Sequence, residues 1–172
     1  MEPINEIQRS RWWYRDIIRA FQSNRTNIRK MGLGSVVKAP IMGRMHCFYY
    51  DPKLKDELPY YDIFPLIVPI DYSIQGGPGF LGLNLHYLPP AARKAFFDKL
   101  LKVRSDKTLN PQSSLLISYS ICKHVASLAP YKQCIKKYLY DHIRSPFLDI
   151  NPEQWNMVVP LPLQSFKKGK PW

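Results

Sequence analysis

The chain has 172 residues, of which 45% are hydrophobic and 13% aromatic, a composition that excludes a largely disordered protein and suffices for a core without disulfides or metals. Its 25 lysines and arginines outnumber its 13 acidic residues, which gives a net charge of +12. Such a charge favours an anionic partner, either nucleic acid or an acidic protein surface.

Residues 3–22 predict an amphipathic helix in which aromatic and aliphatic residues are interleaved with arginines. Arg11, Arg15 and Arg19 recur at every fourth position and therefore fall on one face of that helix. We interpret them as solvated side chains on a helix that docks its aromatic residues on the core. Direct contact with DNA is the alternative.

Residues 23–40 show little periodicity and predict an arm that either lies across a neighbouring subunit or remains mobile. The C-terminal end, from residue 166, predicts a basic tether. Together with the arginines of the helix, these two segments supply the candidate contacts to nucleic acid: Arg11, Arg15, Arg19, Arg25, Arg29, Lys30, Lys167, Lys168 and Lys170.

Three runs rich in aromatic and aliphatic residues predict a small β unit, and turn signals separate them. They lie at residues 44–50, 64–70 and 79–88. Pro65 and Pro69 cannot donate to a strand ladder, so at least part of the second run should be an edge or irregular strand. We expect a strongly bent sheet or a small barrel.

A helical subdomain is predicted after Pro89 and Pro90, which block further strand pairing. Its helices are expected at residues 91–101, 113–127 and 131–143. The second is apolar on most sides and should be buried. The third should turn Tyr138 inward and Lys136 outward, and a short helical turn should follow Asn151.

Tyr49, Tyr50, Tyr60 and Tyr61 lie close in sequence to Lys53 and Lys55. Tyrosines beside lysines can stack on the bases of single-stranded nucleic acid, or they can anchor a protein interface. We favour the protein interface. Its candidate residues are Trp12, Trp13, Tyr14, Tyr60, Tyr61 and Trp172.

Residues capable of catalysis or metal binding are present, but they form no known motif. The four histidines are scattered, and His86 is expected to be a buried imidazole bonded to backbone. The acids around the β unit, including Asp51, Asp56 and Asp62, are assigned to solvated loops, with a magnesium nuclease as a less favoured alternative. Cys47, Cys122 and Cys134 are expected to be reduced core thiols. We therefore predict no enzyme, no catalytic residue, no metal site and no cofactor.

The strings FYYDP, LPYYDIFPLIVPI and GFLGLNLHYLPP resemble a family of small proteins of tailed bacteriophages, chiefly T-even-like myophages, cyanophages and their relatives. This resemblance implies a virion or assembly protein, and it brings no catalytic residues. The favoured role is a structural component of the tail, baseplate or neck, assembled in several copies with other virion proteins. The alternative is a DNA-binding protein that protects the ends of the packaged double-stranded genome.

The expected fold class is α+β, with a bent sheet or barrel-like unit followed by a helical subdomain and with extended terminal arms. One domain is expected, in which residues 1–40 form the basic helix and arm, 41–90 the β unit, 91–150 the helical subdomain and 151–172 the basic tail. No apolar run is long enough to cross a bilayer, and the first residues lack the apolar segment of a signal peptide. The protein is therefore expected to have no membrane partner and to occur in the host cytoplasm and then the virion.

Overall fold

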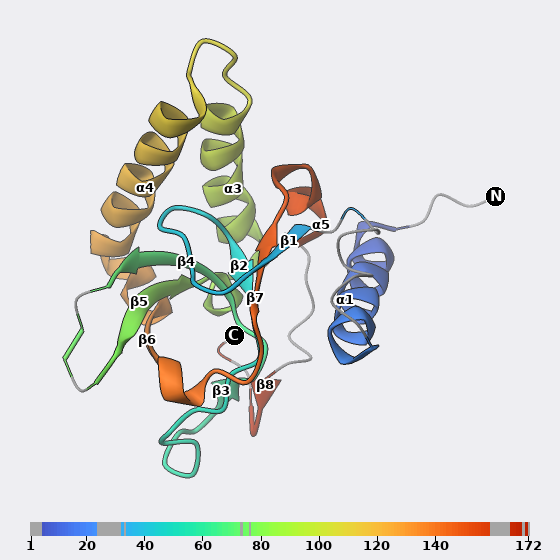
Figure 1. Cartoon of the computed structure of the whole chain (residues 1–172), viewed down its shortest axis with the longest axis vertical. Coiled ribbons are helices and arrows are strands. Elements are labelled where there is room, and N and C mark those ends of the chain that lie inside the picture. The colour runs from blue at the N-terminus through green and yellow to red at the C-terminus, as the bar shows by residue number, and fades with distance from the viewer. Residues whose placement is uncertain are drawn as a thin grey trace.

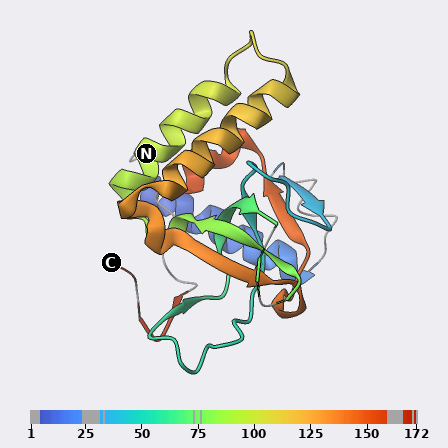
Figure 2. The same cartoon turned by 90° about the vertical axis from the view of Figure 1, so that its left-hand side faces the viewer.

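The computed structural model describes residues 5–23, 32, 34–72, 74–75, 77–158, 166–169 and 171, and its fold is α+β. A curved antiparallel sheet lies at the centre, with the α3–α4 hairpin projecting beyond it and α1 packed along its far side (Figure 1; Figure 2). The helices are α1 Glu6–Ser23, α3 Pro90–Arg104, α4 Pro111–Ser127 and α5 Trp155–Val158, with short 3-10 turns η1 Leu85–Tyr87, η2 Ala129–Cys134, η3 Tyr140–His142 and η4 Pro152–Gln154. The strands are β1 Gly34–Val37, β2 His46–Cys47, β3 Tyr61–Asp62, β4 Leu66–Asp71, β5 Gly79–Asn84, β6 Ile135–Leu139, β7 Phe147–Ile150 and β8 Phe166–Lys167.

The main sheet draws its strands from most of the chain. Its order is β1-β7-β2-β4-β5-β6, and each neighbouring pair is antiparallel. Strand β1 falls within the predicted N-terminal arm, and β8, within the predicted tail, pairs with β3 in a separate two-stranded sheet. This corrects the expectation for residues 34–37 and 166–167, which are paired strands and not free arms.

Strand β4 contains Pro69 and nevertheless lies inside the sheet. On β4, strand β2 pairs only with Leu66 and Ile67, so this ladder ends before it reaches Pro69, which has no N–H to donate. A register shift between Pro69 and Asp71 marks the irregularity that the prolines predicted. The prediction of an edge or irregular strand is therefore confirmed in its second form, an irregular strand inside the sheet, where the short partner strand accommodates the proline.

The sheet curls around Phe48, which is fully buried. Its ring centroid lies 4.8 Å from that of Phe147 on β7 and 5.3 Å from that of Tyr138 on β6, although β2, β4 and β5 separate these two strands. One side chain can contact both only if the sheet bends strongly. Strands β1 and β6 remain the edges of the described sheet, so the predicted bend is confirmed and the barrel is not closed.

Helix α1 covers the other face of the sheet and confirms the predicted amphipathic helix. Trp13, Ile17 and Ala20 are buried in the main core, and the Tyr14 ring meets Phe64 edge-on with a centroid distance of 5.7 Å. Burying such large aromatic side chains stabilises the docked helix by about 1.5–3 kcal/mol each. The arginine-bearing face is left toward solvent.

Helices α3 and α4 confirm two more predictions. Helix α4 begins at an Asn110 cap, whose side chain accepts a hydrogen bond from the Ser113 backbone N–H at 2.8 Å. The expectation that this helix is buried was wrong, because Leu116 is 58% and Ile117 39% exposed. The sequence shows many apolar residues, but the hairpin extends past the sheet and buries only one stripe of them (Figure 1).

The predicted helix at residues 131–143 is wrong. After η2, the chain continues as β6, which pairs with β5 from Leu83↔Ile135 to Gly79↔Leu139. A strand places residues i and i+2 on one face, so Lys136 and Tyr138 lie together, whereas the predicted helix put them on different faces. Because residues 135–139 form a strand, Lys136 and Tyr138 both line the candidate site described below. A short helical segment does follow Asn151, as predicted.

The three cysteines, Cys47, Cys122 and Cys134, are buried free thiols, as predicted. Burial raises the pKa of Cys122 to about 12, which keeps that thiol protonated and unreactive at neutral pH. Among the residues that the structure describes, no helix combines the length and apolar character needed to cross a bilayer.

His46 holds the turn before β2 in its neutral form. Its Nε2 accepts from the Ile41 backbone N–H at 3.3 Å, and its Nδ1 donates to the Arg44 carbonyl at 3.1 Å. Burial, with a smaller contribution from the Arg44 charge, lowers the pKa of His46 to about 3, while the hydrogen bond to Arg44 partly opposes this shift.

The His46 pKa predicts acid sensitivity. Between pH 6.5 and about 3 the unfolded chain binds a proton that the folded one does not. His46 therefore contributes stability that is complete above pH 6.5 and is lost as pH falls, at up to about 1.4 kcal/mol per pH unit. When urea unfolding is measured across this pH range, the free energy of unfolding should fall less for His46→Gln than for the wild type. Identical pH dependence would contradict the assignment.

Candidate nucleic-acid interface

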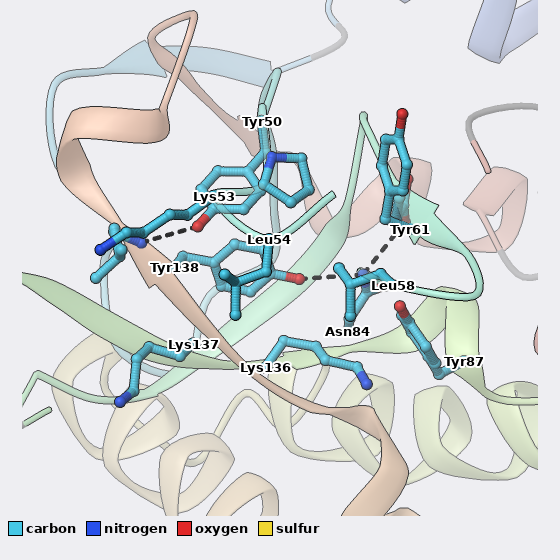
Figure 3. A pocket seen from close by; sticks show the side chains of 13 residues that line it. Tyr50, Lys53, Leu54, Leu58, Tyr61, Asn84, Tyr87, Lys136, Lys137 and Tyr138 are labelled. Atoms are coloured by element: carbon cyan, nitrogen blue, oxygen red, sulfur yellow. Dashed lines mark hydrogen bonds between the residues drawn. The ribbon is translucent and has the colours of Figure 1, made fainter. Parts of the chain in front are cut away.

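A pocket of about 280 Å³ opens where the curled sheet meets the loop that follows Tyr50. It lies between β3, β5 and β6 and combines aromatic walls with lysines (Figure 3). Its lining consists of Tyr50, Pro52, Lys53, Leu54, Leu58, Tyr61, Asp62, Asn84, Tyr87, Lys136, Lys137, Tyr138 and Leu139. We call it the tyrosine pocket.

Tyr50 and Tyr138 form one wall, with ring centroids 4.9 Å apart and nearly perpendicular planes. Both hydroxyls are fixed: Tyr50 accepts from the Leu139 backbone N–H and Tyr138 from the Asn84 amide, each at 3.1 Å. Gly82 makes room for the Tyr138 ring, because a Cβ at this position would lie 3.1 Å from it. This wall is thus rigid and pre-formed.

Asp62, Asn84 and His86 form a buried polar network under the pocket. Asp62 Oδ2 lies 2.6 Å from His86 Nδ1 and 3.2 Å from the Asn84 amide nitrogen, and Oδ1 accepts from the Phe64 backbone N–H at 3.0 Å. Asn84 also accepts from the His86 backbone N–H at 3.0 Å. The expectation that Asp62 is a solvated loop residue was wrong, and the ring of His86 bonds a carboxylate where backbone was predicted.

Three lysines line the pocket from two elements, Lys53 from the loop and Lys136 and Lys137 from β6. Lys136 Nζ lies 4.0 Å from the centroid of the Tyr87 ring, a cation–π distance. Figure 3 shows the two side chains next to each other. Partial burial lowers the pKa of Lys136. Lys137 donates to the Gln75 carbonyl, and Lys53 is exposed.

Lys168 fastens the loop that forms the outer wall of the pocket. Its Nζ donates to the carbonyls of Lys55, Asp56 and Leu58 at 2.8, 3.1 and 3.4 Å. The residue sits in the left-handed region at φ 65°, directly after β8. Lys168 was predicted as a nucleic-acid contact, but its ammonium group is engaged within the fold. Lys167, its neighbour, is exposed and lies opposite Tyr61 in the β3–β8 pair.

A second basic surface lies on α1. Exposed Arg11, Arg15 and Arg19 flank a shallow groove of about 520 Å³, which is also lined by Trp12, Tyr14, Ile18 and Gln22. We call this surface the arginine groove. It shares no lining residue with the tyrosine pocket. Trp12 is 45% exposed and remains available for an interface.

The interface candidates thus divide by burial. Trp13 and Tyr14 are 5% and 8% exposed and pack in the core, so their prediction as protein-interface residues is corrected. Tyr60 is half-buried against Phe166, and Tyr61 lines the pocket. Candidates outside the described residues are Arg25, Arg29, Lys30, Lys170 and Trp172.

Sequence reasoning found Tyr50, Tyr61 and Lys53 as a possible stacking surface, and the structure brings them to one pocket. It missed Lys136 and Tyr138, because the helical pattern assigned to residues 131–143 separated them. The segment Ile135–Leu139 has two adjacent lysines followed by two adjacent apolar residues, so it carries no alternation that would have signalled a strand.

A family model of the phage T4 terminal DNA protecting protein matches residues 2–172. The chain belongs to this family. The resemblance to tailed-phage proteins is thereby confirmed over nearly the whole sequence. No curated protein and no solved structure matches the chain.

In the described part of the chain, no three His, Cys, Asp or Glu residues cluster as metal ligands would. The assignment of Asp56 to an exposed loop agrees with the structure. That the protein is not an enzyme and carries no cofactor stays a prediction.

The network under the pocket predicts a contrast between two carboxylates. Asp62→Asn removes acceptors for His86 and Asn84 and should lower the free energy of unfolding by about 1–3 kcal/mol. Asp56→Asn, an exposed control with the same chemical change, should alter it by less than about 0.5 kcal/mol. Urea unfolding of both variants measures the difference, and equal effects would show that the network does not stabilise the fold.

Proposed function

We propose that this protein binds the ends of the phage's packaged linear DNA and protects them from exonucleases. The match to the terminal DNA protecting protein over residues 2–172 is the observation that carries this proposal. It favours DNA-end protection, the alternative role in the sequence interpretation, over a tail, baseplate or neck component. Other virion proteins stay predicted partners.

The charge of the molecule supports the same function. A net charge of +12 attracts the phosphate backbone at long range, and the exposed arginines of the arginine groove supply contacts at short range. Phosphate contacts carry no sequence information, which suits a protein that must bind whatever sequence lies at the terminus. The protein then acts by occupying the end and needs no catalytic residue.

This function predicts selective protection of open ends. Linear duplex DNA with bound protein should be degraded more slowly by an exonuclease that starts at ends. In a competition assay, short linear fragments should remove the protein from this linear duplex more effectively, per base pair added, than a covalently closed circle does. If circles and fragments compete equally per base pair, the protein is a general DNA binder and end protection is refuted.

The arginine groove is tested by the salt dependence of that binding. Replacing Arg11, Arg15 and Arg19 with Gln should reduce the slope of log affinity against log salt by about 0.9 for each phosphate that the variant no longer neutralises. A matched control removes three exposed charges from the α3–α4 hairpin, Lys99, Lys102 and Lys107, also by Gln. Equal slopes for the two triple variants would mean that only net charge matters.

A further inference from the structure

The shape and charge of the tyrosine pocket limit the class of ligand that it can bind. Its walls are aromatic and aliphatic, so they suit a flat apolar group, while Lys53, Lys136 and Lys137 add positive charge. The carboxyl group of Asp62 is only 3% exposed and engaged by His86, so it opposes an anion less than a free carboxylate would. A ligand made of a flat ring joined to an anionic group matches both the apolar walls and the lysines.

The volume of the pocket limits the size of that ligand. About 280 Å³ lies just below the volumes typical of small-ligand pockets and suits one ring system, not the end of a duplex. A base inside a duplex is stacked on both sides and paired, so extracting it costs a few kcal/mol. An unpaired base at a terminus avoids most of that cost. If the pocket takes a base, an unpaired one at an end therefore costs less to bind than a paired one in the interior.

Resting on the proposed function, we propose that the tyrosine pocket binds an unpaired terminal nucleotide of the DNA, stacking its base on tyrosine and holding its phosphate with lysine. Tyr61, half-exposed on β3, is the wall that the base contacts, and Lys136 places a charge beside Tyr87. Lys168 is a positioning residue, because it secures the loop carrying Lys53, Leu54 and Leu58.

The test uses hairpin duplexes that have one open end, so that each probe presents a single terminus to the full-length protein. The open end is blunt, carries a one-nucleotide overhang, or carries an abasic overhang with the same phosphate. Affinity measured by fluorescence anisotropy should be highest for the normal overhang, by about fivefold or more over the abasic one, which lacks only the base. Equal affinity for normal and abasic overhangs would overturn the proposal.

Pocket variants assign the effect to residues. Tyr61→Ala should abolish the preference for the normal overhang over the abasic one, whereas Tyr61→Phe should retain it, because the phenyl ring still stacks. Lys136→Gln should weaken both overhangs equally, since it removes a phosphate contact. Tyr72→Ala, an exposed tyrosine outside the pocket, is the matched control and should behave as the wild type. Urea unfolding shows whether each variant is folded.

The failures of the two proposals are distinguishable. If open-ended hairpins outcompete a dumbbell closed at both ends, but Tyr61→Ala binds every probe as the wild type does, end binding stands and the pocket is overturned. That result would also follow if a protein segment occupied the pocket. If the dumbbell binds as well as the open hairpins, the proposed function fails and this inference fails with it.

Discussion

The burial of Phe48 between strands that are not neighbours in the sheet is the constraint on which the rest of the structure depends. Because its ring touches both Phe147 and Tyr138, the sheet must curl, and the curl brings β6 toward the loop after Tyr50. The isolated bridge between Tyr50 and Ile143 holds the same region from the other side. Without this curl, the tyrosine pocket would be a flat sheet surface.

Polar interactions then set the details of the pocket. A buried carboxylate is costly unless hydrogen bonds replace its hydration, and Asp62 receives them from Asn84, His86 and the Phe64 backbone. The same network orients Tyr138, because the Asn84 amide donates to its hydroxyl, so the wall formed by Tyr50 and Tyr138 is linked to the core. Lys168 adds a long-range restraint, because it joins the last strand to the loop more than a hundred residues earlier in the chain. Hydrogen bonds therefore link the tyrosine wall of the pocket to the buried network below it and hold the loop that forms its outer wall.

The local elements of the fold were predictable from the sequence because local patterns determine them. Helices α1, α3 and α4 have apolar periodicity, and Pro90 and Asn110 mark where two of them begin. Strand β6 was not predictable in this way, because its residues fit a helical pattern and show no alternation, and pairing with β5 makes them a strand. The short strands β1, β7 and β8 owe their structure to partners far away in the sequence. The same holds for the candidate site. Tyr50 and Tyr61 were predicted from the local sequence, whereas strand pairing brings Asn84, Lys136 and Tyr138 into the same pocket.

The central claim is that this protein sits at the terminus of a DNA molecule, and a hydroxyl-radical footprint on a long linear duplex tests it most directly. Each strand is labelled in turn, and cleavage is compared with and without protein at a salt concentration that suppresses non-specific binding. The account predicts protection confined to about the last helical turn, roughly 10 base pairs, at both ends and for any terminal sequence. Protection spread evenly along the duplex, or centred on an internal sequence, would contradict it.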